Sequence, residues 1–238
     1  VEDLVPQRRP FPWITLAIVL ANVLVFAYEL TLSGRTFDRF VSSWGVVPYD
    51  LTHLANVSDP SRVLATLVTS MFIHGGFLHI IGNMWFLHLF GSTLEDRLGH
   101  GRFLVFYLLC GIAASVIYFI VDIHSRLPAF GASGAIAGVM GAYIVLFPRA
   151  RILTLFLILF FPVFIQISAF VYIGLWFLLQ LVSGTLSLGS PEAGGGVAWW
   201  GHIGGFIAGI GLLPCFRKKG PSSRRAFPDE TYHYLNRE

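Results

Sequence analysis

A single serine hydroxyl stands among small residues in the stretch AFGASGAIAGVMGAY, residues 129–143. This serine, Ser133, lies between Gly131 and Gly134, with Ala132 intervening. A serine hydroxyl becomes an effective nucleophile when a neighbouring base takes its proton, and imidazole is the usual base near neutral pH. The chemistry to test is therefore nucleophilic catalysis by Ser133 together with a histidine.

Two other apolar segments carry histidine or amide side chains. The segment HGGFLHIIGN contains His74, His79 and Asn83. The segment GHIGGFIAG at residues 201–209 contains His202. His79 and Asn83 are four residues apart and share one face of a helix. An unpartnered buried imidazole or amide costs about 1 to 3 kcal/mol, so we expect these groups to face the protein interior and one another.

Plainer roles exist for the same residues. A serine in a membrane helix usually bonds back to a carbonyl of its own helix, so Ser133 taken alone is more often structural. His74, His79 and His202 also offer three nitrogen ligands for a metal ion. The spacing H-x4-H differs from H-E-x-x-H, however, and no carboxylate stands nearby as ligand or base. We therefore expect no metal and no cofactor.

The elements that position these residues are membrane spans. The chain has 238 residues, of which 55% are hydrophobic and 12% charged, which is typical of an integral membrane protein. A helical span needs about 20 mostly apolar residues. Six segments fit, near residues 12–32, 77–95, 102–122, 132–147, 168–185 and 197–216. The run 152–167 contains Pro162, which would break a helix, so we interpret it as interfacial or re-entrant.

Basic residues indicate the direction of the spans. With an internal N-terminus, twelve of the sixteen Lys and Arg residues fall inside, which predicts that both termini are cytoplasmic. Ser133 and His202 then begin spans that enter from outside, and His79 and Asn83 lie at a similar depth. The net charge of +3 is scattered over short loops and the tail, which argues against nucleic acid as a partner.

Small residues recur at intervals of four in the fourth and sixth of these spans. They are Gly134 with Gly138, Ala137 with Gly141, and Gly201 with Gly205 and Gly209. Residues of this size and spacing let helix backbones pack closely. We expect the two spans to be in contact, which would bring the hydroxyl of Ser133 and the imidazole of His202 within hydrogen-bond reach.

Four motifs together resemble the rhomboid family of intramembrane serine proteases. They are HGGFLHIIGN at 74–83, LEDRLGHGRF at 94–103, GASGAIAGVMGA at 131–142 and GHIGGFIAG at 201–209. The motifs follow the family's order, and the likeness covers about residues 12–216. It implies an all-α, polytopic bundle of six transmembrane helices with a long first outer loop, in the bacterial plasma membrane. Residues 1–11 are then a cytoplasmic segment, and 217–238 a basic cytoplasmic tail that we expect to be disordered.

The resemblance also implies roles for individual residues. Ser133 matches the nucleophile and His202 the general base of a serine endopeptidase that cleaves transmembrane segments of membrane proteins near the outer face. His79 and Asn83 match the pair that stabilises the oxyanion. Supporting roles fall to His74, Gly131 and Gly134.

Partners and alternatives follow from the same likeness. The implied partners are transmembrane protein substrates and membrane lipid. Many family members carry an aromatic residue four positions after the serine, where this chain has Ala137, so another group must hold His202. The glycine-rich loop at 191–198 is expected to cover the site. The alternative is a catalytically inactive relative that binds membrane clients without cutting them.

Overall fold

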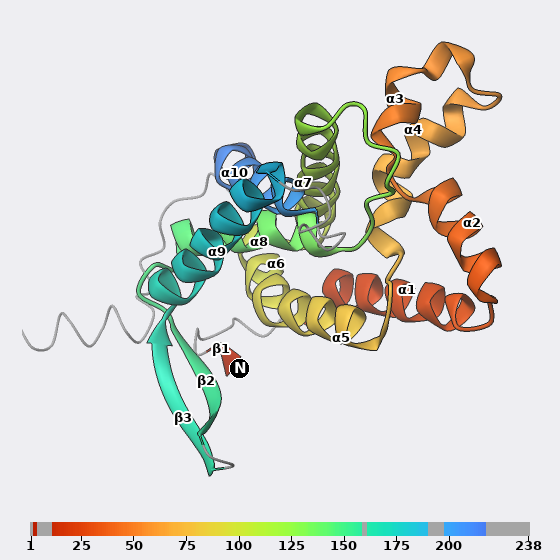
Figure 1. The fold of residues 1–238 in the computed structure, drawn as a ribbon. Helices are drawn as coiled ribbons and strands as arrows, with labels where there is room; N and C mark the ends of the chain where they lie inside the picture. The colour runs from red at the N-terminus through yellow and green to blue at the C-terminus, as the bar shows by residue number, and fades with distance from the viewer. Residues whose placement is uncertain (1, 4–10, 159–160, 190–197, 218–238) are drawn as a thin grey trace, which may run out of the picture.

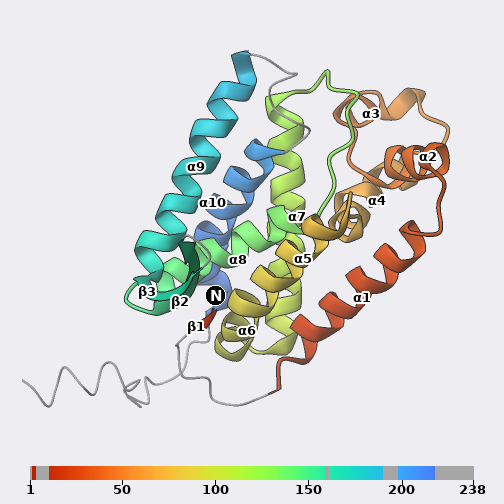
Figure 2. The same ribbon diagram turned by 60° about the horizontal axis from the view of Figure 1, so that its bottom comes forward.

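The structure, a computed structural model, describes residues 2–3, 11–158, 161–189 and 198–217. Within these residues, six apolar helical segments form the bundle, and α8 lies at its centre (Figures 1 and 2). In chain order they are α1 (Trp13–Glu29), α5 (Phe77–Phe86) continued by the π-helical η3 (Leu87–Gly91) and α6 (Ser92–Leu98), α7 (His100–Val121), α8 (Ser133–Leu146), α9 (Ala169–Gly189) and α10 (Trp199–Phe216). Each falls within a few residues of a predicted span, so the predominantly helical membrane fold is confirmed.

Helix length does not confirm the predicted count of six spans. Among the described residues, α7, α9 and α10 are long and apolar enough to cross a membrane alone. The segments Pro60–Phe72 and Phe77–Leu98 pass the same test as one pair bent by 82°. The helices α1 and α8 are apolar but shorter, with 17 and 14 residues.

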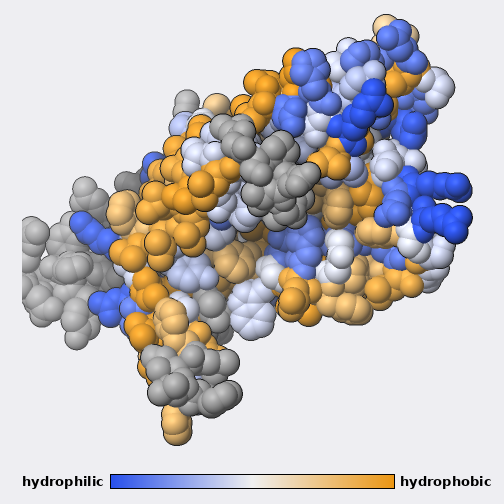
Figure 3. Space-filling view, viewed as in Figure 1, coloured by the Kyte–Doolittle hydropathy of each residue, from blue (hydrophilic) through white to orange (hydrophobic). Residues whose placement is uncertain are grey.

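The outer surface of the bundle is apolar where a bilayer would cover it. Along α9, large exposed side chains recur at intervals of three and four residues: Leu175, Leu178, Leu179, Val182 and Leu186. Apolar surface extends widely over the bundle (Figure 3). Soluble proteins rarely expose apolar surface so extensively, whereas a multi-pass membrane protein does so where lipid covers it.

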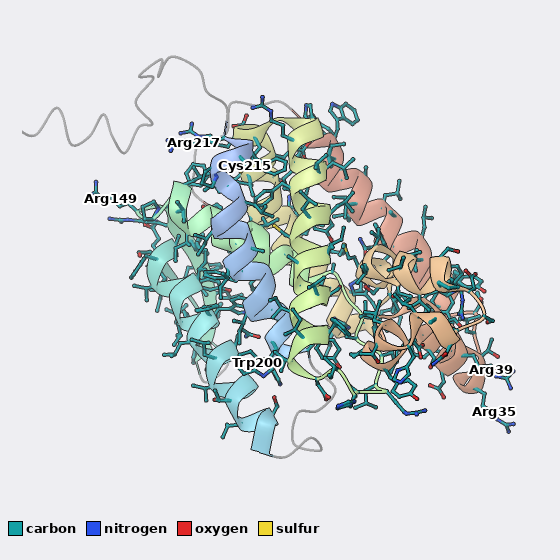
Figure 4. The ribbon with its side chains drawn as sticks, turned by 90° about the horizontal axis from the view of Figure 1, so that it is seen from above. Arg35, Arg39, Arg149, Trp200, Cys215 and Arg217 are labelled. Carbon is teal, nitrogen blue, oxygen red and sulfur yellow. The ribbon has the colours of Figure 1, made fainter. Side chains whose placement is uncertain are left out.

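Arginines that the predicted topology assigns to opposite sides of the membrane lie at opposite ends of the bundle. Arg149 and Arg217 lie at one end, near Cys215, whereas Arg35 and Arg39 lie toward the other end, as Trp200 does (Figure 4). The predicted topology requires this separation, because it assigns the first two arginines to the inside and the second two to the outside.

The long first outer loop folds into short helices beside the bundle (Figure 1). They are α2 (Gly34–Trp44), α3 (Pro48–Thr52), η1 (Leu54–Asn56), α4 (Pro60–Thr69) and η2 (Ser70–Phe72). Val46 in this loop pairs with Ala129 through two backbone hydrogen bonds of 2.9 and 2.8 Å. Gly131 N–H donates to the carbonyl of Ser70 at 2.8 Å. These hydrogen bonds attach the first outer loop to residues 129–131, the segment that leads into Ser133.

Residues 151–158 and 161–168 form an antiparallel strand pair, which the expectation of an all-α fold did not include. Strand β2 (Arg151–Ile158) pairs antiparallel with β3 (Phe161–Ser168), and β1 (Glu2–Asp3) adds to the other side of β2. Pro162 excludes a helix here, but it is tolerated in β3 because this strand lies at the sheet edge, where a missing N–H leaves no ladder bond unmade. The pair of strands β2 and β3 projects from the bundle (Figure 1).

The predicted contact between α8 and α10 is confirmed. A Cβ added at Gly205 would overlap the carbonyl of Gly134, and one added at Gly209 would overlap the carbonyl of Gly138. Gly141 meets the carbonyl of Phe206 in the same way. Only residues without a side chain allow the two backbones to come this close.

Candidate active site

Ser133 and His202 are brought together by the packing of α8 on α10. Ser133 is the first residue of α8, and His202 lies in the first turn of α10. The distance between Ser133 Oγ and His202 Nε2 is 2.7 Å, and both side chains are half-buried. This is the hydrogen bond that a serine needs if an imidazole is to take its proton.

Gln180 of α9 holds the other side of the imidazole. Its Oε1 lies 2.8 Å from His202 Nδ1, and its Nε2 donates to the carbonyl of Trp176 at 3.3 Å. A carbonyl can only accept, so the amide nitrogen of Gln180 must face Trp176 and the amide oxygen must face His202. Nδ1 therefore carries the proton, and in the neutral ring Nε2 is left to accept from the hydroxyl of Ser133.

Two indole rings lie near His202, whereas position 137 contributes no ring of its own. Ala137 is fully buried and presents only a methyl group. The rings of Trp176 and Trp199 each have centroids 6.1 Å from that of His202. The expectation that another group holds His202 is thus met by two indole rings and by Gln180.

Hydrogen-bond donors gather on the other side of Ser133. Gly75 N–H donates to His79 Nδ1 at 3.4 Å, which leaves the proton of a neutral His79 on Nε2. A Cβ added at Gly131 would lie 2.8 Å from His79 Nε2, and Gly131 has a φ of 122° that L side chains rarely adopt. A side chain at position 131 is therefore excluded both by the ring and by the backbone.

Asn83 and the N-terminus of α8 supply further donors. Asn83 Nδ2 is buried and has no hydrogen-bond partner among the described residues. No side chain caps α8, so the N–H of Ser133 is not satisfied within the helix. An unpaired buried donor costs free energy, so Asn83 Nδ2 is available to an acceptor that enters the groove.

A groove of about 790 Å³ opens over these groups. His79 and Asn83 line it from α5, Trp176 and Gln180 from α9, and Ser133 from α8. A second cavity of about 40 Å³ also reaches Ser133 and His202, and Ser70 and Tyr118 line it. The volume of the larger groove is in the range of ligand-binding clefts, and the smaller cavity has room for water.

His74 lies behind His79 instead of facing Ser133. Its backbone N–H points at the carboxylate of Glu29, with distances of 3.3 and 3.2 Å to the two oxygens. Its ring is buried and stacks edge-on against His79 at 5.0 Å. Within the described part of the chain, no three His, Cys, Asp or Glu side chains form a group that could hold a metal ion.

Gln180 was missed by reasoning from the sequence. A signal existed, because Gln180 is the only amide in the apolar run LWFLLQLV, and a polar side chain within a membrane helix usually has a partner. Two further predictions cannot be followed in the structure: residues 191–197 of the covering loop predicted at 191–198, and residues 218–238 of the tail, lie outside the described residues.

The comparisons with known proteins agree on one family. Residues 61–219 match the family described as Rhomboid domain. RHOMBOID-like protein 12, mitochondrial, from Arabidopsis thaliana is 33% identical over 208 residues, covering 78% of this chain and 57% of that protein. The human presenilin-associated rhomboid-like protein, mitochondrial, is 29% identical over 147 residues, covering 60% of this chain and 35% of that protein.

RHOMBOID-like protein 1 from Arabidopsis thaliana is 28% identical over 159 residues, covering 58% of this chain and 40% of that protein. The chain thus spans between about a third and three fifths of the length of these relatives. The matched region includes Ser133, His202, His79 and Asn83. By the family match over two thirds of its length, this chain belongs to the Rhomboid family.

Proposed function

We propose that this protein is an intramembrane serine endopeptidase in which Ser133 is the nucleophile and His202 the general base. The observation that carries the proposal is the 2.7 Å contact between Ser133 Oγ and His202 Nε2 at the base of an open groove. A serine with a purely structural role at the start of α8 would need no oriented imidazole beside its hydroxyl.

The reaction follows from the placement of donors and acceptors. Ser133 Oγ attacks the scissile carbonyl carbon while its proton passes to His202 Nε2. The oxygen of the tetrahedral intermediate accepts hydrogen bonds from Asn83 Nδ2, His79 Nε2 and the N–H of Ser133. His202 then returns the proton to the leaving amine. Water, activated by the same imidazole, hydrolyses the acyl-enzyme and restores the hydroxyl.

The substrates of this proposal are transmembrane segments of other membrane proteins. Such a segment would approach through the bilayer and enter the groove between α5 and α9, whose outer surfaces are apolar. Its helix must unwind there, because a peptide carbonyl engaged in a helical hydrogen bond is not free to enter the oxyanion site.

The membrane in which the protein acts is also part of the proposal. Two of the three relatives named above are mitochondrial by name, so the comparisons do not support a bacterial plasma membrane. The proposed site faces the side of the membrane that carries Arg35 and Arg39, and the proposed topology assigns Arg149 and Arg217 to the opposite side.

The competing function is binding of membrane clients without cleavage. The similarity to rhomboid-like relatives supports membership of the family, but the names of these relatives do not state that they cleave peptide bonds. Both functions would use the groove, but only cleavage requires the hydroxyl of Ser133 and the imidazole of His202. These two side chains therefore decide between the functions.

The test uses the full chain purified in detergent and reconstituted in liposomes with a set of single-span reporter proteins. A fluorophosphonate reagent should label Ser133, and reporter cleavage should vanish in Ser133→Ala and in His202→Ala. Cleavage should persist in the presence of a metal chelator. Binding of reporters by a folded wild-type protein with neither labelling nor cleavage would establish the competing function.

A further inference from the structure

We propose that Gln180 is the positioning residue for His202, so that α9 determines whether the base is correctly oriented. This inference rests on the proposed function and adds a third side chain to it. No carboxylate contacts His202 among the described residues, and the acceptor for Nδ1 is the neutral amide oxygen of Gln180 at 2.8 Å.

The amide of Gln180 is itself held in one orientation. It is buried, with 6% of its surface exposed, and its nitrogen is tied to the carbonyl of Trp176 one turn earlier in α9. Rotating the amide by 180° would set its nitrogen against the donor of His202 and its oxygen against a carbonyl, and both contacts would be repulsive. The position of α9 therefore determines which ring nitrogen of His202 carries the proton.

The same face of α9 packs against α10 on both sides of this contact. One turn before Gln180, the ring of Phe177 stacks on Phe206 at 4.3 Å. One turn after it, Trp200 Nε1 donates to the carbonyl of Gly184 at 3.1 Å. Residues 177, 180 and 184 follow the spacing of one helix face. Gln180 therefore reaches His202 only while α9 is seated on α10.

This arrangement links the entry of a substrate into the groove to the orientation of His202. The groove that would admit a substrate lies between α5 and α9, and Gln180 and Trp176 line it. A displacement of α9 that widened the groove by separating α9 from α10 would also remove the acceptor from Nδ1. Without that acceptor the ring can place its proton on Nε2, where it can no longer accept from Ser133. Catalysis then requires α9 to return to α10 after the substrate is bound.

The experiment compares two substitutions in the full chain reconstituted in liposomes. Gln180→Met keeps the length of the side chain and removes the acceptor, whereas Gln180→Glu keeps an acceptor oxygen. Thr185→Val is the matched control, because the hydroxyl of Thr185 is exposed and bonds to Leu181 O of its own helix at 2.9 Å. For each variant, kcat and KM for a transmembrane reporter, the rate of fluorophosphonate labelling and the thermal midpoint are measured.

We expect Gln180→Met to lower kcat and the labelling rate roughly tenfold, the kinetic equivalent of one hydrogen bond to the base, with KM and thermal midpoint unchanged. Gln180→Glu should recover part of kcat, because it keeps an acceptor for Nδ1 but loses the donor to the carbonyl of Trp176. The acid limb of its pH–rate profile should move to higher pH, because a carboxylate favours the imidazolium. Thr185→Val should behave as wild type.

Wild-type kcat and labelling in Gln180→Met would overturn the inference while leaving the proposed function intact. So would a loss confined to KM or to the thermal midpoint. If Gln180→Met does not fold, the pH–rate profile of Gln180→Glu decides, and a profile identical to wild type overturns the inference. A wild-type protein that neither cleaves nor labels would remove the proposed function and this inference together.

Discussion

Glu95 of α6 closes the N-terminus of α1 by accepting hydrogen bonds from Thr15. Its Oε2 lies 2.7 Å from the backbone nitrogen and 2.7 Å from the hydroxyl of Thr15, and its Oε1 accepts from the N–H of Ile14 at 2.9 Å. His100 Nδ1 contacts the same carboxylate at 2.5 Å. Because α1 has no side-chain cap of its own, this buried carboxylate is what satisfies its first turn.

Replacing Glu95 should destabilise the whole bundle. Glu95→Ala leaves two helix N–H groups and a hydroxyl unpaired in a buried site, and we expect it to lower the free energy of unfolding by roughly 3 kcal/mol. The measurement is thermal or denaturant unfolding in micelles. Asp38→Asn, at an exposed acid on α2, is the control and should change little. Equal midpoints for Glu95→Ala and wild type would show that the carboxylate does not hold α1.

Two glycines of α10 should respond in opposite ways to the same substitution. Gly209→Ala places a methyl group against the carbonyl of Gly138, and relieving this overlap should cost about 1 to 3 kcal/mol and misplace His202 relative to Ser133. Gly211→Ala meets nothing within 4 Å and should be neutral or stabilise the helix by up to about 1 kcal/mol. Thermal midpoints and fluorophosphonate labelling distinguish the two. Similar behaviour of both variants would contradict the observed packing.

Asn83 is expected to act on the transition state more than on substrate binding. Its Nδ2 has no partner among the described residues, so it is available to the oxyanion. Asn83→Ala should lower kcat by about 10²-fold with little change in KM, and His79→Ala should have a similar effect. His88→Ala, at an exposed ring on the same span, should retain activity. A change in KM alone would assign Asn83 to binding instead.

Asp59 makes the first outer loop sensitive to acid. A hydrogen bond from the hydroxyl of Ser61 at 2.6 Å, and then one from the N–H of Arg62 at 3.0 Å, hold the pKa of Asp59 below its ordinary value. A lowered pKa means that this cap of α4 contributes fully above the ordinary pKa of aspartate and is lost as the pH falls through the lowered value.

Thermal midpoints of wild type and Asp59→Ala measured against pH test this cap. The difference between the two proteins should be constant near neutral pH and should shrink on acidification below the ordinary pKa of aspartate. A difference that stays constant in acid would mean that the carboxylate charge does not contribute.

Much of the candidate site could be anticipated because membrane helices obey local rules. Apolar runs predicted the helices within a few residues, and the glycines at 205 and 209 predicted the close approach of α10 to α8. When the directions of two packed helices and their points of contact are predicted, it follows which residues of the two helices lie at the same level and are neighbours. The approach of Ser133 to His202 followed from these two facts alone.

The pairing of β2 with β3 was not predicted by such local rules. The apolar run with Pro162 excluded a helix but did not choose among loop, re-entrant segment and strand pair. That choice depended on the pairing of residues such as Arg151 with Ser168, which close a sheet and satisfy the backbone. Pairing of this kind is a property of two segments and is not encoded in the periodicity of either one.

By itself the sequence determined the membrane class of the chain, the approximate bounds of its apolar helices and the resemblance of its motifs to the Rhomboid family. Only the tertiary structure decided which side chain orients His202. The physical reason is that a lone polar residue such as Gln180 can face any direction around its helix, and its direction is set by how α9 rotates against α10. That rotation is determined by contacts such as Phe177 with Phe206, which join residues far apart in the chain.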